Sequence, residues 1–132
     1  MSVQPDTRLL NRELGILSFN RRVLAQALDP SIPPLERLRY LCIVSSNLDE
    51  FFETRVAQLQ DLREHDRTSI TPDGLPVTHA LALIAEDAHA LVAEKYRALQ
   101  ESIYPLLAGI GVRFVTSDQW TPEQTAWARA YF

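Results

Sequence analysis

The sequence predicts an all-α protein, an antiparallel helical bundle with long helices. Three observations predict this fold class. Apolar residues recur at three- and four-residue steps over long stretches, which is helical periodicity rather than strand alternation. Short segments rich in proline, glycine and small polar residues separate these stretches. With 132 residues, 46% of them hydrophobic and 23% charged, the chain is long enough to bury a core of its own.

The first helix is predicted over residues 17–28, where the apolar positions follow the helical repeat: Ile16, Phe19, Val23, Leu24, Ala27 and Leu28. It should end before Pro30. The stretch of residues 31–34 (SIPP) reads as a turn, and its second proline can occupy the first position of the next helix.

The second apolar stretch runs from Leu35 to Leu62, or roughly eight turns at the helical repeat. Three poor helix formers, Ser45, Ser46 and Asn47, interrupt it without changing its phase. We therefore expect a kink or a tight break at these three residues, with both halves packed on the same surface.

A loop with a central turn is predicted over residues 67–78 from the sequence Pro-Asp-Gly and a further proline. A third long helix should follow, with apolar residues from Leu81 to Ile110 and either Gly109 or Gly111 at its C-cap. Residues 112–115 (VRFV) alternate in the manner of a strand.

The last helix should begin at Pro122, with Thr121 as its N-cap and an acidic residue directly after the proline. Its apolar pattern is unfinished at residues 127–131, so we expect the chain to be a piece of a longer polypeptide.

The composition favours a cytoplasmic protein. Cys42 is the single cysteine, and its neighbours Leu41 and Ile43 suggest a buried thiol in a reducing compartment. No window approaches the apolar run of about eighteen residues that a membrane span needs, and residues 1–6 lack the layout of a signal peptide. We expect no nucleic-acid partner and no transmembrane segment, and peripheral membrane association stays open for a longer protein.

Residues that could carry acid, base or metal chemistry are present but lack partners. His65, His79 and His89 each stand in a polar or helix-end setting, so we interpret them as exposed surface side chains. Glu86 and His89 form one Glu-x-x-His step, which is half of a carboxylate-bridged di-iron pattern whose other members are missing. We assign this chain no catalytic residue and no metal ligand.

The most suggestive stretch is residues 45–52 (SSNLDEFF), for which two interpretations stay open. Asn47 and Glu50 have the spacing of a capping box, in which they would only restart a helix. The same asparagine amide could instead present a donor and an acceptor to the edge of a base such as adenine.

Three blocks in this order resemble the N-terminal domain of the bacterial polyphosphate kinase family, whose enzymes form a phosphohistidine intermediate. They are residues 11–20 (NRELGILSFN), 34–39 (PLERLR) and 46–56 (SNLDEFFETRV). The resemblance implies an enzyme that reversibly transfers the terminal phosphate of ATP to polyphosphate. It implies that Asn47 contacts adenine in ATP, and that the catalytic histidine and most phosphate ligands belong to other domains.

By the same resemblance, the chain comprises a helical N-terminal domain over residues 1–111 and, over residues 112–132, the truncated start of a second domain, the head domain, with its first helix. ATP, ADP and polyphosphate are the expected ligands, and Mg²⁺ is expected in the full-length enzyme with ligands outside this chain. Its own head and C-terminal domains are the expected partners, the full-length enzyme is expected to be a homo-oligomer, and the isolated domain should be inactive. The family commonly has tryptophan and serine where this sequence has Ile16 and Gly15, which affects the expected packing beneath the nucleotide. The competing hypothesis is a helical interaction or scaffold module without a nucleotide role.

Overall fold

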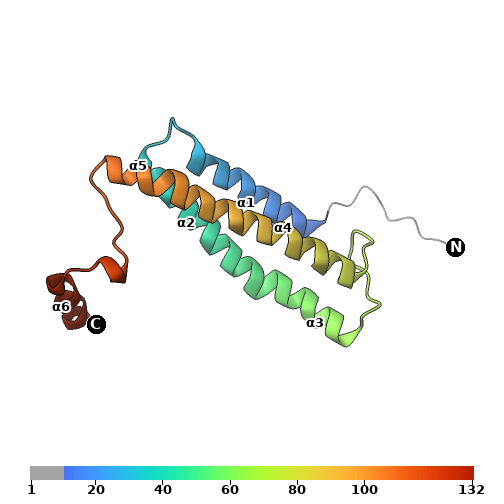
Figure 1. The fold of residues 1–132 in the computed structure, drawn as a ribbon. Coiled ribbons are helices and arrows are strands. Elements are labelled where there is room, and N and C mark those ends of the chain that lie inside the picture. Colours follow the sequence, from blue (N-terminus) through green and yellow to red (C-terminus); the bar gives the residue numbers. More distant parts are fainter. Residues whose placement is uncertain (1–10) are drawn as a thin grey trace.

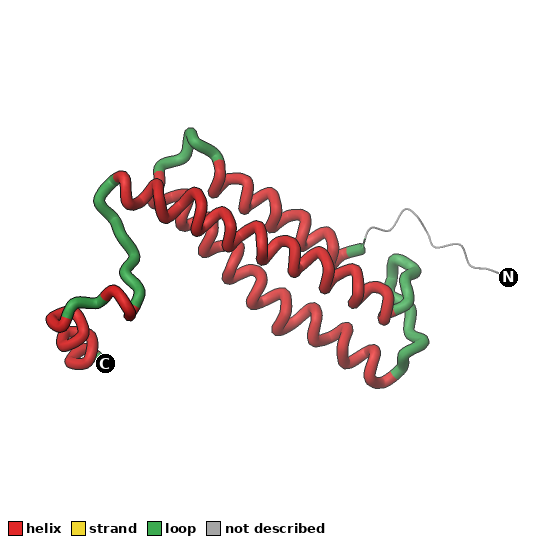
Figure 2. Tube along the Cα trace, viewed as in Figure 1, coloured by secondary structure: helices red, strands yellow, loops and turns green. Residues whose placement is uncertain are grey.

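The computed structural model describes residues 11–132, and in this part of the chain three long helical rods form an antiparallel bundle. The first rod is α1 (Arg12–Leu28). The second comprises α2 (Pro34–Glu50), the π-helical segment η1 (Phe51–Val56) and α3 (Ala57–His65). The third comprises α4 (Val77–Arg97), the π-helical segment η2 (Ala98–Ile103) and α5 (Tyr104–Gly109). Figures 1 and 2 show α1, α2 and α4 side by side, which confirms the all-α bundle.

The core lies where α1 packs on α2 and α4. Its members are apolar side chains that are almost completely buried: Leu17, Leu24, Ala27, Leu41, Val44, Leu48, Phe51, Val56, Ile84, Ala88, Leu91, Ala98, Ile103 and Leu107. Within the α-helices they stand at three-, four- or seven-residue steps, so the periodicity in the sequence marks the faces that meet. The two five-residue steps, from Phe51 to Val56 and from Ala98 to Ile103, cross the π-helical segments η1 and η2. Cys42 is exposed, contrary to the prediction, because it lies one position beyond Leu41 and is rotated away from the core.

The start of α1 lies earlier than predicted. The helix begins at Arg12 rather than near residue 17, because the side chain of Asn11 accepts a hydrogen bond from the backbone N–H of Leu14 at 2.9 Å and caps the first turn. Gly15 lies inside this regular helix, and a Cβ at that position would meet nothing within 4 Å.

The predicted kink at Ser45, Ser46 and Asn47 is wrong. The α-helical pattern continues to Glu50, and the departure from it comes one turn later, in η1. Tertiary packing overrides the weak helix propensity here, since Val44 and Leu48 on either side are buried in the core. Asn47 does not cap a helix, so the capping-box interpretation is wrong as well.

The third rod begins at Val77 and keeps its course past Pro105. A proline inside a helix removes a backbone donor and clashes with the carbonyl four residues earlier, and the widened π-helical turn of η2 directly precedes it. Gly111 ends the rod at a positive φ of 87°, where the N–H groups of Gly111 and Val112 donate to the carbonyls of Ala108 and Leu107. This confirms the glycine C-cap and places it at the second of the two predicted positions.

Residues 112–116 have no regular secondary structure, and the strand suggested by their alternation does not form. A strand requires a neighbouring strand for its hydrogen bonds, and none of the described residues supplies one there. The short 3-10 turn η3 (Ser117–Gln119) leads to α6 (Pro122–Tyr131), drawn apart from the bundle in Figure 1. Thr121 and Gln124 form a reciprocal capping box, which confirms the predicted helix start.

None of the helices formed by residues 11–132 has the length and apolarity required to cross a bilayer. Residues 1–10, and with them the predicted absence of a signal peptide at residues 1–6, lie outside the described part of the chain.

Candidate functional site

A pocket of about 270 Å³ opens between α1 and the second rod, at the junction of α2 and η1. It holds two asparagines, two aromatic rings and two opposite charges. The lining residues are Ile16, Phe19, Asn20, Asn47, Glu50, Phe51, Thr54 and Arg55. Five of these eight come from the stretch of residues 45–52 or the turn after it, so the segment singled out in the sequence forms one wall of the pocket.

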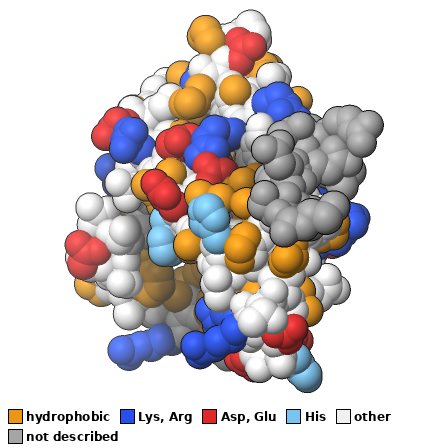
Figure 3. Space-filling model, turned by 90° about the vertical axis from the view of Figure 1, so that its right-hand side faces the viewer, with side chains coloured by type: hydrophobic (Ala, Val, Ile, Leu, Met, Phe, Trp, Pro, Cys, Tyr) orange, Lys and Arg blue, Asp and Glu red, His pale blue; other side chains and the backbone are white. Residues whose placement is uncertain are grey.

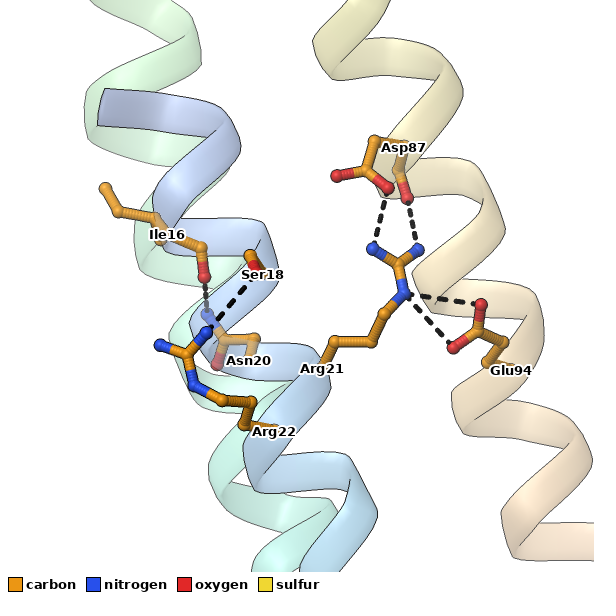
Figure 4. Close-up of polar contacts among 7 residues, drawn as sticks. All are labelled: Ile16, Ser18, Asn20, Arg21, Arg22, Asp87 and Glu94. Carbon is orange, nitrogen blue, oxygen red and sulfur yellow. Dashed lines mark hydrogen bonds and ion pairs between the residues drawn. The ribbon is translucent and has the colours of Figure 1, made fainter. Parts of the chain in front are cut away.

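The two asparagines face each other across α1 and α2. The Nδ2 group of Asn47 donates to Oδ1 of Asn20 at 2.9 Å. The Nδ2 group of Asn20 donates in turn to the carbonyl oxygen of Ile16, one turn earlier on α1, at 3.0 Å (Figure 4). Asn20 is only 1% exposed, whereas Asn47 is half-buried and reaches the pocket. The pair therefore links a buried polar group to an accessible one.

The π-helical segment η1 shapes the pocket beyond Asn47. A π turn carries one more residue than an α turn, which changes the direction of the side chains that follow. Phe51, 2% exposed, packs into the core, and Thr54 donates its hydroxyl to the carbonyl of Glu50 at 2.6 Å. The widened turn thus places Thr54 and Arg55 in the same pocket as Asn47.

The pocket carries charge as well as amides. Glu50 and the half-buried Arg55 both line it, and within residues 11–132 neither forms an ion pair. A cation, a carboxylate and an asparagine around apolar walls suit a ligand with a flat apolar body and polar edges.

A second polar cluster joins α1 to α4 away from this pocket. Arg21 lies 2.7 Å from Asp87 and 3.3 Å from Glu94, and Figure 4 shows its guanidinium turned toward both. The hydrogen bond that Arg21 donates to Asp87 raises the pKa of Arg21 above its ordinary value, against a smaller opposing effect of burial. The guanidinium is therefore cationic at every accessible pH, and the cluster acts as an interhelical link.

The remaining sequence candidates do not join the pocket. His65, His79 and His89 are exposed, as predicted, and histidine side chains are visible on the surface in Figure 3. Glu86 and His89 lie one turn apart on α4, and nowhere in residues 11–132 do three potential metal-binding side chains gather.

Comparison with known proteins identifies the family. The family described as Polyphosphate kinase N-terminal domain matches residues 9–115 of the chain. The chain belongs to this family. A polyphosphate kinase of Burkholderia cenocepacia is 55% identical to this polyphosphate kinase N-terminal domain over 124 residues, which is 94% of the chain and 18% of that relative. A polyphosphate kinase of Paraburkholderia phytofirmans is 50% identical over 124 residues, which again is 94% of the chain and 18% of that relative. The chain thus spans about a fifth of the length of the curated relatives that it matches.

Sequence reasoning missed one residue of the polyphosphate kinase N-terminal domain that the pocket depends on. Asn20 stands at a core position of α1, between Leu17 and Leu24, where the helical repeat calls for an apolar side chain. A polar residue at such a position usually has a buried hydrogen-bonding partner. That signal was available in the sequence, but the partner, Asn47, is 27 residues away and only the fold identifies it.

Proposed function

We propose that this domain forms part of the ATP site of a polyphosphate kinase, with Asn47 contacting the adenine base. In this proposal the whole enzyme reversibly transfers the terminal phosphate of ATP to polyphosphate. The observation that carries the proposal is the half-buried amide of Asn47 in a pocket with apolar and aromatic walls. An asparagine amide offers one acceptor and two donors, and it can form a bidentate pair with adenine.

The size of the pocket supports a base rather than a complete nucleotide. Small-molecule sites usually measure roughly 300–1,000 Å³, whereas this pocket measures about 270 Å³. Phe19 and Phe51 supply flat apolar surface, and Arg55 supplies a positive charge for the more anionic part of a nucleotide. The sugar and the phosphates would extend out of the pocket toward the rest of the enzyme.

We expect this chain alone to transfer no phosphate. Phosphoryl transfer depends on positioned cations and a nucleophile around the phosphate groups, and the pocket offers a single arginine and no histidine. We therefore place the catalytic histidine and the Mg²⁺ ligands outside this chain. Detectable transfer from ATP to polyphosphate by the purified 132-residue chain would contradict this part of the proposal.

We also propose that the domain boundary falls near residue 111, with residues 112–132 beginning the head domain. The glycine cap at Gly111 ends the third rod, and α6 contributes no buried residue. Trp127 and Tyr131 are exposed on α6, which supports a contact with another domain of the same enzyme. We expect a cytoplasmic enzyme, because its substrate ATP is cytoplasmic. We also expect a homo-oligomer, and we assign no residue of this chain to the contact between subunits.

The test is the substitution Asn47→Ala in the full-length enzyme. Losing a bidentate contact is expected to raise the KM for ATP by about tenfold, with kcat at saturating ATP nearly unchanged. The KM for polyphosphate should stay the same.

The matched control is Ser45→Ala, two residues earlier on α2. Ser45 accepts a hydrogen bond from Lys95 at 3.1 Å and does not line the pocket. The Ser45→Ala substitution therefore removes an interhelical contact and leaves the proposed base site unchanged. The KM of this variant for ATP should equal that of the wild type. The competing scaffold hypothesis expects an unchanged KM for both variants, and that result would refute the nucleotide role.

A further inference from the structure

We infer that Asn20 is a positioning residue that fixes which end of the Asn47 amide faces the pocket, and that it thereby makes the site select adenine over guanine nucleotides. The inference rests on the proposed contact between Asn47 and the base. It adds a residue at the floor of the pocket that is 1% exposed and holds Asn47 through a hydrogen bond.

The carbonyl oxygen of Ile16 determines the orientation of the Asn20 amide. A backbone carbonyl can only accept hydrogen bonds. The part of the Asn20 amide that lies 3.0 Å from it must therefore be the NH₂ group. Since Asn20 is 1% exposed, a flipped amide would point its oxygen at the carbonyl oxygen with no water to separate them, which is costly.

The same logic fixes the next amide. Because its NH₂ group donates to the carbonyl of Ile16, Asn20 turns Oδ1 toward Asn47. This amide oxygen can only accept a hydrogen bond, so the group of Asn47 that faces it must be a donor. The NH₂ group of Asn47 therefore faces Asn20, at 2.9 Å. Within residues 11–132, Oδ1 of Asn47 accepts no hydrogen bond. The acceptor Oδ1 and the second N–H of Asn47 are thus left for a ligand, in a fixed arrangement.

This arrangement distinguishes the two purines. Adenine presents an exocyclic NH₂ donor beside a ring-nitrogen acceptor, which matches an amide that offers its oxygen beside an N–H. Guanine presents the acceptor O6 at the position of that NH₂ group, so the fixed Oδ1 of Asn47 would meet another acceptor. An asparagine free to flip could turn its NH₂ group to O6, and the link to Asn20 opposes this flip.

A purely structural role for the pair makes a different prediction. If the two amides only join α1 to α2, their loss should reduce stability and affect every nucleotide equally. Nucleotide selectivity therefore separates the two roles. The measured quantity is the ratio of kcat/KM for ATP to kcat/KM for GTP in polyphosphate synthesis by the full-length enzyme.

The decisive variant is Asn20→Leu, which keeps a side chain branched at Cγ with the same number of non-hydrogen atoms and removes the acceptor that orients Asn47. Ile16 retains its own helical hydrogen bond, and Asn47 is exposed enough to reach water, so no buried group loses all of its partners. We expect the ATP-to-GTP ratio to fall by about tenfold, the usual scale of one base-discriminating pair. Asn20→Ala, which adds no bulk, is the second variant and should give the same result.

The matched control is Asn20→Asp. An aspartate presents an oxygen to Asn47 whether it is ionised or protonated, so Asn47 keeps its orientation although the domain loses stability. The ratio should stay within about twofold of the wild type, well below the tenfold scale of a lost base contact. Equal ratios in the wild type, Asn20→Leu and Asn20→Ala would overturn the inference, as would a ratio that falls equally in Asn20→Asp.

Asn47→Ala, measured alongside, separates this inference from the proposed function. If Asn47→Ala raises the KM for ATP while Asn20→Leu keeps the wild-type ratio, the base contact stands and the role of Asn20 is refuted. An unchanged KM in Asn47→Ala refutes both.

Discussion

The bundle of residues 11–111 and the segment of residues 112–132 are both helical and rich in apolar side chains, but they are held together in different ways. Polar contacts in the bundle join distant parts of the chain, as between Arg21 and Asp87, 66 positions apart. In residues 112–132, every described side-chain hydrogen bond joins residues at most five positions apart. The bundle has a buried core, whereas α6 has no buried residue.

This difference shows that signals from neighbouring residues can start a helix, whereas packing between helices fixes its position and its side chains. The capping box at Thr121 is sufficient to start α6, but none of the residues of this helix is buried. The bundle instead keeps a continuous helix through Ser45, Ser46 and Asn47, where local propensity is weak. Precise side-chain geometry, such as that of the asparagine pair, arises only where packing holds the helices in place.

The largest expected effect is on stability, and it appears when a core leucine of the bundle and an exposed aromatic residue of α6 are each replaced by alanine. Leu17→Ala removes a side chain that is 0% exposed and should reduce the free energy of unfolding of the 132-residue chain by about 3 kcal/mol. Trp127→Ala removes a larger side chain that is 67% exposed and should change it by less than about 0.5 kcal/mol. Urea unfolding followed by circular dichroism measures both values. Similar losses for the two variants would show that α6 is packed as firmly as the bundle.

The next effect tests the long-range polar contacts. Arg37, 7% exposed, donates through Nε to the carbonyl of Ala27 at 2.7 Å and through its second terminal nitrogen to Ser102 at 3.2 Å. Ala27 lies in the last turn of α1, where carbonyls lack helical partners, so Arg37 satisfies a helix end and contacts η2 as well. Arg37→Met should reduce the free energy of unfolding by about 2 kcal/mol.

The control for Arg37→Met is Arg39→Met, two positions along the same helix. Arg39 is exposed and pairs with Glu36 at 3.8 Å within α2. An exposed pair of this kind contributes well below 1 kcal/mol, so Arg39→Met should be close to neutral in the same urea titration. If both variants lost equal stability, long-range contacts would have no advantage over local ones.

Sequence patterns predicted the features that depend on neighbouring residues. The helical stretches, the loop after His65, the glycine cap at Gly111 and the start of α6 all follow from signals within a few positions. The domain boundary at residue 111 and the adenine contact at Asn47 stay predictions. The residues of the candidate pocket were predicted only in part. Residues 45–52 were singled out and the resemblance placed Ile16 beneath the nucleotide, but Phe19 and Asn20 of the α1 wall were not predicted.

The errors have a common physical cause, which is that they concern contacts between distant residues. The break at Asn47 does not occur because core packing keeps α2 helical through this position, and the amide that would have capped a helix binds Asn20 instead. Residues 112–116 form no strand because pairing needs a second strand. Cys42 is exposed because apolar neighbours in sequence do not share its face of the helix.

The smallest expected effect concerns the response to acid of two aspartates, one with a hydrogen bond to a distant residue and one with hydrogen bonds to near neighbours only. Asp73 accepts hydrogen bonds from Thr71 at 2.6 Å and from Asn11, 62 positions away, at 3.2 Å. Burial raises the pKa of Asp73, but the hydrogen bonds to its carboxylate outweigh burial and hold that pKa below its ordinary value. A lowered folded-state pKa means that the charged form stabilises the fold above about pH 4, and that this stabilisation is lost as the pH falls through the folded-state pKa.

Asp73→Asn should therefore destabilise the chain by a few tenths of a kcal/mol to about 1 kcal/mol at pH 7, and the difference from the wild type should shrink below about pH 4. Asp66→Asn is the local counterpart, because Thr68, two positions away, holds the pKa of the exposed Asp66 below its ordinary value. A turn of this kind can also form in the unfolded chain, so its loss should matter less. Unfolding by urea at pH 7 and pH 3 measures both variants, and an equal or larger acid response in Asp66→Asn would contradict the advantage of the contact to Asn11.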